Sequence, residues 1–339
     1  MPAFRRAAVT RVLSERPGLQ RVETDAGRAY VLTQLTGPVA VGDDVIVNTT
    51  AVDLGLGTGG WHVVHWNLAR DGWVEPGPGH IMKLRYTSLQ ADTGAAEEHH
   101  PDLPSSLDGA PVVVCGLHSQ VPAVAVSVLA ARPAARLAYV MTDGAALPLA
   151  LSDLVDAMVD RGVLAATITA GHAFGGDLEA VSVPSALALA RHVLDADVTI
   201  VAMGPGVVGT GTPLGTTSVE VASALDAAAA LDGTPIAALR MSGADPRPRH
   251  RGVSHHSRTA LELVRSSVLV AAPEPGLDLP ARHDVRVVPP PAVADLLADA
   301  GLAVTTMGRG PAEDPLFFQA AGAAGALAAS LLPPPVAAE

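Results

Sequence analysis

The sequence contains a single cysteine, Cys115, so no disulfide bond can form within the chain. This cysteine usage is typical of a reducing cytosol. The N-terminal residues MPAFRRAAVTRV carry an arginine pair but no apolar run behind it, which does not fit a secretory signal peptide. We therefore expect a cytoplasmic protein.

Basic charge is also scarce. The net charge is −12, no block of basic residues is present, and the chain has one lysine, Lys83, against 21 arginines. This balance argues against nucleic acid as a partner. Because lysine and arginine are not interchangeable at specific sites, the single lysine is a candidate functional residue.

Aromatic residues make up only 3% of the chain and hydrophobic residues 49%, so the core must consist mainly of Ala, Val and Leu. No long, strongly apolar run is present: residues 316–332, the longest weakly polar stretch, contain Gln319 and two glycines. That stretch favours a packed helix over a membrane span. The length of 339 residues suits one large domain with a small one.

Residues 1–75 predict a small all-β domain, a barrel or curled sheet, because short β-rich runs alternate with Gly-containing breaks. Residues 76–110 are expected to form a linker with one basic strand in its middle, GHIMKLRYTSLQ. On that strand, Lys83 and Arg85 would face an anionic ligand. The alternative is an ordinary edge strand blunted by charge.

Residues 111–331 predict an α/β domain, and residues 332–339 a disordered tail. Apolar β-rich runs alternate with helical segments, which is typical of a mostly parallel, doubly wound sheet covered on both faces. The expected strands are residues 111–115, 136–141, 164–169, 198–203, 235–240, 267–272, 284–288 and 303–307.

The stretch from Val198 to Leu231 organises this domain. An apolar strand, VTIVAM, leads into GPGVVGTGTPLG and then into a helical segment in which Thr217 and Glu220 have the spacing of a capping box. A strand, a glycine-rich turn and a helix together present backbone N–H groups to an anion. We expect the ligand to contact Gly204, Gly206, Gly209, Thr210, Gly211 and Thr212.

Polar residues follow each of five strands, and the carboxyl ends of parallel strands are where ligands bind in open α/β sheets. The alternative is that these polar residues have no binding role and are present because every turn between a strand and a helix needs such residues. Candidates on this edge are His118 and Asp143 as catalytic groups, and Ser119, Gln120 and His172 as ligand-binding groups.

The residues GPGVVG formally match GxGxxG after a strand, but six more residues precede the helical segment, unlike a dinucleotide-binding turn. Arg240, with Ser242, stands where an acidic ribose ligand is usual and suits a 2′-phosphate. An NADP-binding oxidoreductase therefore stays open as an alternative.

The segment RPRHRGVSHHSRTALELV, residues 247–264, concentrates positive charge just before a helix. His255 and His256 are candidate acid–base residues, because imidazole titrates near neutral pH, and Arg251 and Ser254 are candidate ligand contacts. Adjacent histidines can also ligate a metal. The spacing lacks HExxH and a cysteine set, so we assign no metal ligand.

The motifs GHIMKLRYTSLQ, GLHSQ, AGHAFGGDLEAV, GPGVVGTGTPLGTTSVE and HRGVSHHSRTAL together resemble a bacterial family catalogued as domain of unknown function 3866. The likeness covers nearly the whole chain. The family has no established activity, cofactor or catalytic residue, so the resemblance implies one cytosolic unit and no mechanism.

The reading favoured by the sequence is a cytosolic protein that binds an anionic small molecule, phosphorylated or carboxylated, and acts as a transferase or hydrolase. No cofactor is assigned. A rival reading is a non-catalytic regulatory or scaffold protein. Small residues of the final helix, Gly322 and Gly325 among them, suit packing against the sheet or a symmetric partner, so we expect a homodimer.

Overall fold

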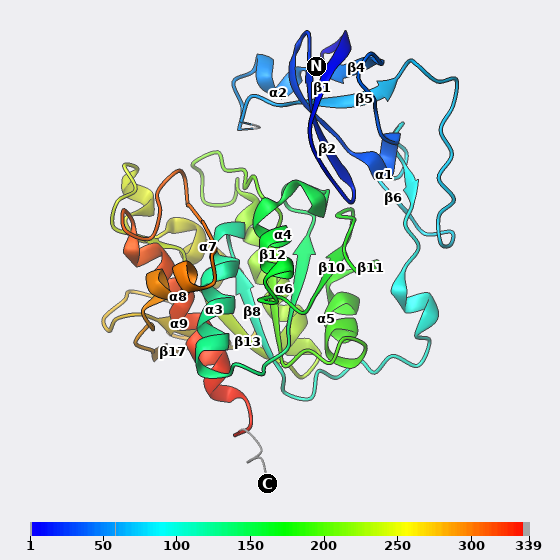
Figure 1. Ribbon diagram of the computed structural model, residues 1–339. Coiled ribbons are helices and arrows are strands. Elements are labelled where there is room, and N and C mark those ends of the chain that lie inside the picture. Colours follow the sequence, from blue (N-terminus) through cyan, green and yellow to red (C-terminus); the bar gives the residue numbers. More distant parts are fainter. Residues whose placement is uncertain (1, 58, 335–339) are drawn as a thin grey trace. The chain divides into compact units, whose positions relative to one another are not determined.

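A computed structural model of the chain describes residues 2–57 and 59–334. The chain divides into two compact units, residues 1–94 and residues 95–339 (Figure 1). The division falls within the segment expected to be a linker, and the end of that segment, with Leu107 fully buried, belongs to the core of the second unit. Of the expected disordered tail, residues 335–339 lie outside the described residues.

Five strands of the first unit form a closed barrel in the order β1-β2-β3-β5-β4. Small aliphatic side chains such as Val22, Val31 and Val45 fill its interior. Burial alternates along the strands because successive side chains point to opposite faces. The expected barrel-like domain is thereby confirmed. Its elements are β1 (Phe4–Arg16), β2 (Leu19–Thr24), β3 (Gly27–Val31), α1 (Thr33–Thr36), β4 (Asp44–Asn48), α2 (Thr50–Asp53) and β5 (His62–Asn67).

The prediction of a long basic strand between residues 80 and 90 is wrong. Only β6 (Met82–Lys83) is extended there, and it pairs antiparallel with β7 (Ala91–Asp92). Leu84 has φ of 52°, in the left-handed region, so the chain turns at once. The Thr87 hydroxyl donates a hydrogen bond to the Leu84 carbonyl at 2.7 Å and closes that turn.

The second unit contains an eight-stranded sheet in the order β11-β10-β9-β12-β8-β13-β16-β17, and all its neighbouring strands are parallel. The central strands are fully buried runs of small apolar residues, as expected for strands covered on both faces. The strands are β8 (Pro111–Cys115), β9 (Leu137–Thr142), β10 (Ala166–Ala170), β11 (Leu178–Ala180), β12 (Val198–Met203), β13 (Thr234–Ala238), β16 (Leu269–Ala272) and β17 (Asp284–Val287).

Helices cover both faces of this sheet, so the predicted doubly wound α/β class is confirmed (Figure 1). One core cluster joins the sheet to α3 (Val121–Ala131), α4 (Asp153–Asp160), α8 (Val293–Asp299) and α9 (Pro315–Leu331). A second joins it to α5 (Val183–His192), α6 (Glu220–Ala230) and α7 (His255–Leu263). Short elements complete the unit: η1 (Ala96–His99), η2 (His118–Gln120), η3 (Leu149–Leu151), η4 (Thr217–Val219), β14 (Met241–Ser242), η5 (Pro248–His250) and β15 (Gly252–Val253).

The chain changes faces around strand β8. The connection after β8 leads to α3 on one face, whereas those after its two neighbours, β12 and β13, lead to α6 and α7 on the other. Connections that diverge in this way leave a crevice at the carboxyl ends of the strands, where open α/β sheets bind ligands. The topology therefore directs attention to the ends of β8, β12 and β13.

The small residues of α9 are used inside the chain. A Cβ at Gly325 would lie 2.3 Å from the carbonyl oxygen of Val124 in α3, and one at Gly322 would lie 2.3 Å from the Val293 side chain in α8. These glycines allow α9 to approach both helices within the chain. They therefore give no support to the expected homodimer. Among the described residues, no helix is both long and apolar enough to cross a membrane.

Two local predictions are wrong. Residues 303–307 form no strand, only an isolated bridge between Thr306 and Arg309, because the chain turns back there. Glu220 does not close a capping box with Thr217; the cap of η4 is Thr216, whose side chain accepts from the Ser218 amide. The Glu220 carboxyl group instead reaches Thr142 at the end of β9.

Candidate functional site

The connection between β12 and η4 is a glycine-rich loop, residues 204–216, folded back on itself. The Thr210 amide donates to the Gly215 carbonyl at 2.7 Å, and the Thr217 amide donates to the Val208 carbonyl at 3.0 Å. Within the described part of the chain, the amides of Gly206, Val207, Gly209 and Gly211 donate no hydrogen bond. These N–H groups remain available to a ligand.

A group of basic side chains follows strand β13. The ring centroids of His255 and His256 are 4.3 Å apart, and each is 5.0 Å from that of His250. The guanidinium Nη1 of Arg240 lies 3.1 Å from Nδ1 of His256. We call these residues, with Arg249, the histidine–arginine cluster: Arg240, Arg249, His250, His255 and His256.

Local backbone structure places the histidines together. Ser254 is the N-cap of α7, and its hydroxyl oxygen accepts a hydrogen bond from the His256 amide. The same hydroxyl lies 2.8 Å from Nδ1 of His250. Capping by serine stabilises the first helical turn. One buried serine therefore orders the helix start and orients a ring from the preceding η5.

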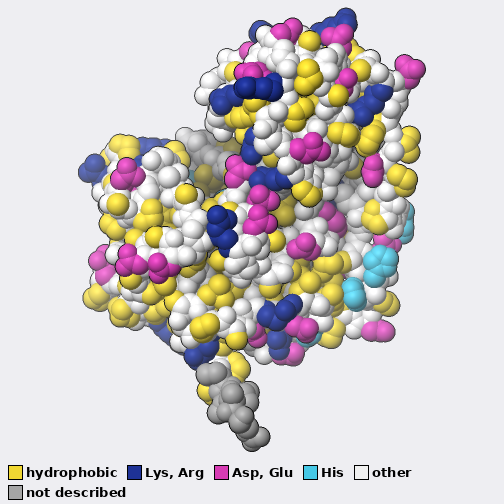
Figure 2. Space-filling view, viewed as in Figure 1, with side chains coloured by type: hydrophobic (Ala, Val, Ile, Leu, Met, Phe, Trp, Pro, Cys, Tyr) yellow, Lys and Arg dark blue, Asp and Glu magenta, His cyan; other side chains and the backbone are white. Residues whose placement is uncertain are grey.

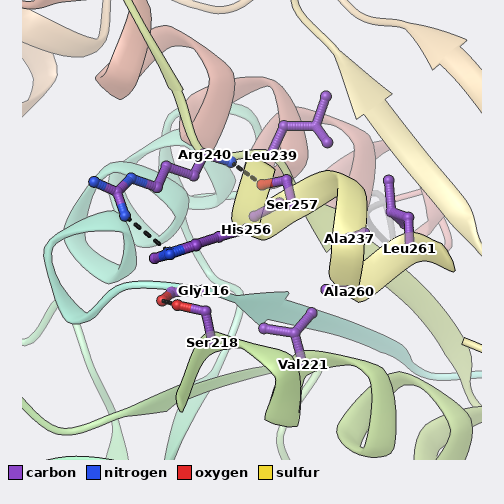
Figure 3. Close-up of a pocket in the computed structure, with 11 residues that line it drawn as sticks. Gly116, Ser218, Val221, Ala237, Leu239, Arg240, His256, Ser257, Ala260 and Leu261 are labelled. Atoms are coloured by element: carbon purple, nitrogen blue, oxygen red, sulfur yellow. Dashed lines mark hydrogen bonds between the residues drawn. The ribbon is translucent and has the colours of Figure 1, made fainter. Parts of the chain in front are cut away.

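The Arg240–His256 contact determines which nitrogen of the His256 ring carries its proton. An arginine guanidinium has donors and no acceptor, so Nδ1 of His256 must accept. A neutral ring then holds its proton on Nε2. Figure 3 shows this pair, with the Arg240 backbone amide bonded to the hydroxyl of Ser257 at 2.8 Å. His256 is thereby set to donate from Nε2.

A buried aspartate network lies next to the cluster. Asp245 accepts two hydrogen bonds from Arg247, Nε to Oδ1 at 2.9 Å and Nη2 to Oδ2 at 2.8 Å. Its Oδ2 also lies 3.4 Å from Nη2 of Arg309 and 3.8 Å from Nη2 of Arg240. Asp314, fully buried, accepts from Ser242 and from Arg309. The Arg247 side chain holds the pKa of Asp245 well below its usual range.

The electrostatics keep the three imidazoles neutral. Burial, followed by the neighbouring arginines, lowers the pKa of His250 to about 3 and of His256 to about 4, and lowers that of His255. Burial also lowers the pKa of Arg240 to about 10, so its guanidinium remains charged at neutral pH. Arg249 makes no hydrogen bond or ion pair within the described part of the chain. The cluster therefore carries uncompensated positive charge.

The glycine-rich loop and the histidine–arginine cluster meet. A Cβ at Gly209 would lie 3.4 Å from Nε2 of His256, and one at Gly211 would lie 3.6 Å from Cζ of Arg249. Because glycine has no side chain, the His256 ring lies directly against the backbone of Gly209, and the Arg249 guanidinium lies directly against that of Gly211. The structure thus brings together the predicted residues Gly209, Gly211 and His256.

A cavity lies beneath this junction, at the ends of β8 and β13 and between α6 and α7 (Figure 3). Its volume of about 20 Å³ is room for about one water molecule. A whole metabolite does not fit inside it. The residues that line it are Gly116, Ser218, Val221, Ala237, Ala238, Leu239, Arg240, His256, Ser257, Ala260 and Leu261.

His118, a predicted catalytic residue, is part of a separate buried relay. Its Nδ1 lies 3.1 Å from the Tyr139 hydroxyl and its Nε2 lies 2.7 Å from the Ser152 hydroxyl. Since the tyrosine donates to the carbonyls of Ala202 and Met203, its oxygen accepts from Nδ1–H of His118. Both ring nitrogens are used and burial lowers the pKa to about 4, so this geometry gives His118 a structural role.

An acidic group occupies the end of β9. Thr142 donates to Glu220, and a Cβ at Gly144 would touch the same carboxylate. Burial, together with the neighbouring charge of Asp143, raises the pKa of Glu220 to about 7. In the sheet, β9 is three strand positions from β13, roughly 14 Å at the usual strand spacing. Asp143 and Glu220 therefore form a second group along the same edge.

Other predicted ligand contacts are placed apart from the cluster or are used structurally. The Gln120 side chain ties the β8 turn to the carbonyl of Leu239, and the Asp143 carboxylate accepts from the His172 amide. Ser119 lies in η2 and Arg251 donates to the Asp245 carbonyl. Thr210 and Thr212 bond each other within the loop, and Gly204 packs against Ala146. Lys83 and Arg85 belong to the first unit, and their part in a ligand site stays a prediction.

Sequence reasoning missed several contributors. In the sequence, Arg249 and His250 stand out only as part of the basic segment 247–264, and Glu220 only as a capping residue. Asp245 and Asp314 are separated by 69 positions, so their shared arginine, Arg309, leaves no local pattern. The signal in the sequence is the density of arginine around Asp245, which Arg240, Arg247, Arg249 and Arg251 flank.

Acidic and basic side chains are interspersed on the face drawn in Figure 2, and the described residues form no continuous basic surface there. The fold and the site define a doubly wound α/β protein with a basic crevice and a separate β-barrel unit. The family model described as "Protein of unknown function (DUF3866)" matches residues 28–325, and the chain belongs to this family. No curated protein and no solved structure gave a significant match.

The NADP alternative loses its basis in this topology. In a dinucleotide-binding fold, the strand before the glycine-rich turn and the strand carrying the ribose ligand are neighbours. Here β8 lies between β12 and β13. Helix α6 begins at Glu220, well beyond Gly209, and Arg240 is buried on His256.

Proposed function

We propose that the protein binds a small molecule through a phosphate or carboxylate group held at the histidine–arginine cluster under the glycine-rich loop. The observation that supports this most directly is the exposed guanidinium of Arg249 beside Gly211: among the residues that the structure describes, neither this guanidinium nor the Gly211 amide has a hydrogen-bond partner. A guanidinium and backbone N–H groups are the donors that oxyanions accept from.

The ligand's size follows from the cavity. Because the buried space holds about one water molecule, only the anionic group can approach the cluster closely. The remaining atoms of the ligand must lie over the exposed loop. We therefore propose a cytosolic small metabolite whose specificity comes from the loop surface, with no role for a nucleic acid or a membrane.

The arrangement suits transfer or hydrolysis of the anionic group. His256 is neutral and can donate a hydrogen bond from Nε2–H to an oxygen of the ligand, whereas Nε2 of His255 is buried and has no hydrogen-bond partner among the described residues. An imidazole nitrogen in that state can accept a proton. The positive charge of Arg240 and Arg249 would stabilise negative charge that develops on the ligand.

The test is isothermal titration of the full-length protein with inorganic phosphate and a panel of phosphorylated and carboxylated metabolites. The variants are Arg249→Gln and the matched control Arg286→Gln, which removes one positive charge on the edge strand β17, where Arg286 pairs with Asp284. We expect the first to weaken binding by about tenfold or more, since a hydrogen bond to a charged group contributes about 1.5–3 kcal/mol. Equal affinities for both variants would exclude Arg249 from the site.

A further inference from the structure

The three imidazoles of the histidine–arginine cluster offer one set of converging nitrogen atoms. His250, His255 and His256 each have a ring nitrogen within 4.8 Å of those of the other two. They come from one short segment, the end of η5 and the first turn of α7, whose capping serine holds the ring of His250 and the backbone amide of His256. No cysteine takes part, and the nearby carboxylate, Asp245, is already held by arginine.

Within the described part of the chain, each of the three rings has a nitrogen to which the protein makes no hydrogen bond. Nε2 of His255 is buried and unpartnered. In His250, Nδ1 faces the Ser254 hydroxyl, so Nε2 is the nitrogen left for a ligand. A buried polar atom without a partner costs about 1–3 kcal/mol, which binding of a ligand at that nitrogen would offset.

We propose that His250, His255 and His256 form a binding site for a divalent transition-metal ion of the zinc class. Three imidazoles with an open fourth position are a known zinc donor set, and imidazole suits zinc, copper and nickel better than magnesium or calcium. With Zn–N bonds of about 2.0–2.1 Å, tetrahedral ligand atoms lie about 3.4 Å apart. Because the ring nitrogens lie within 4.8 Å of one another, they must approach each other by up to about 1.4 Å.

Metal binding has a specific consequence for Arg240. In the structure, Nδ1 of His256 accepts from Arg240, which keeps the ring proton on Nε2. For Nε2 to bind a metal, that proton must leave it through solvent while Nδ1 takes one up, so the ring stays neutral and no net proton is released. Nδ1–H can no longer accept, and Arg240 must turn away. Oδ2 of Asp245, 3.8 Å from Nη2 of Arg240, is the acceptor within reach.

The arginines therefore oppose the metal through both charge and the ring tautomer, and this sets the direction of the test. Arg240→Gln removes the donor that holds Nδ1 and one positive charge, so zinc affinity should rise. The same change should weaken phosphate binding. Arg249→Gln, at an exposed position, provides a second variant that does not depend on the buried network and should raise zinc affinity by a smaller factor.

The experiment is titration of the purified full-length protein with Zn²⁺ alone, with Co²⁺ as a spectroscopic probe, and with phosphate absent. We expect one ion per chain, visible absorption bands of tetrahedral cobalt, and at least about a hundredfold weaker binding in His255→Ala, since loss of even an outer partner costs 10–100-fold. His192→Gln is the matched control, because His192 lies in α5 and bonds the Ser106 carbonyl.

Zinc affinity unchanged in His255→Ala, or no stoichiometric binding to the wild-type chain, would overturn the metal site. The inference does not rest on the proposed function, because the metal is tested without an anion and the anion without a metal. A chain that binds phosphate but not zinc retains the first proposal and loses the second, and the converse result does the opposite.

Discussion

Gly209 of the glycine-rich loop stands against His256 of α7, so that a Cβ at Gly209 would come within 3.4 Å of Nε2. That distance is ordinary van der Waals contact, and the φ of Gly209 lies outside the left-handed region. Gly209→Ala should therefore fold normally while its methyl group covers the ring nitrogen. We expect weaker phosphate binding with an unchanged melting temperature, measured by titration calorimetry and thermal unfolding.

Gly243→Ala is the control for this change, because a Cβ at Gly243 meets nothing within 4 Å. If Gly209→Ala and Gly243→Ala bind phosphate equally well, the ligand does not reach His256 from the loop side.

The buried carboxyl group of Glu220 predicts a pH dependence of stability. Its folded pKa is raised from 4.5 to about 7, so between these values the folded chain binds a proton that the unfolded chain has released. The free energy of unfolding must then fall as pH rises through this window. Glu220→Gln does not titrate. The melting temperature of this variant should rise relative to that of the wild type as the pH increases from 5 to 7.5. A difference in melting temperature that stays constant across that range would contradict the burial of this carboxyl group.

His118 predicts that the free energy of unfolding changes with pH in the opposite direction. Its folded pKa is lowered from 6.5 to about 4, so between these values the unfolded chain binds a proton that the folded chain excludes, and stability falls as pH falls. His118→Ala also leaves Tyr139 and Ser152 without their partner. We expect a loss of about 1–3 kcal/mol at pH 7 and a weaker acid dependence, measured by urea unfolding at several pH values. His255→Ala, at a partly exposed position, should cost much less.

The packing of α9 on α3 is tested at Gly325. A Cβ there would lie 2.3 Å from the backbone oxygen of Val124, and backbone cannot move aside as a side chain can. Gly325→Ala should destabilise the chain by about 1–3 kcal/mol, the usual cost of overpacking, as measured by denaturant unfolding. An unchanged midpoint would mean that the two helices are not in close contact.

The fold was largely predictable because its strands are local signals. The runs PVVVC and VTIVAM coincide with β8 and β12 to the residue, since a buried parallel strand needs little more than β-branched apolar side chains. The strand predicted over residues 303–307 failed for the same reason, because an apolar run can also form a turn that packs on the core.

The candidate site was predictable only in part. The polar strand ends indicate the sheet edge at which the glycine-rich loop and the histidine–arginine cluster meet, and the sequence singles out the loop and the histidine pair. What the sequence could not supply was the order of the strands, which separates β12 from β13 and sets Glu220 apart from His256. The sequence also could not distinguish His118 from His255. Both ring nitrogens of His118 are hydrogen-bonded, whereas Nε2 of His255 is buried without a hydrogen-bond partner among the described residues.

The most direct test of the oxyanion site is nitrogen NMR of the histidine rings, with the ¹⁵N-labelled chain titrated with inorganic phosphate and His256→Ala used for assignment. The ring nitrogens of His256 and His255 should shift with a single saturable affinity, while those of His118 stay fixed. If phosphate leaves the His255 and His256 resonances unmoved at millimolar concentration, the cluster does not bind an oxyanion.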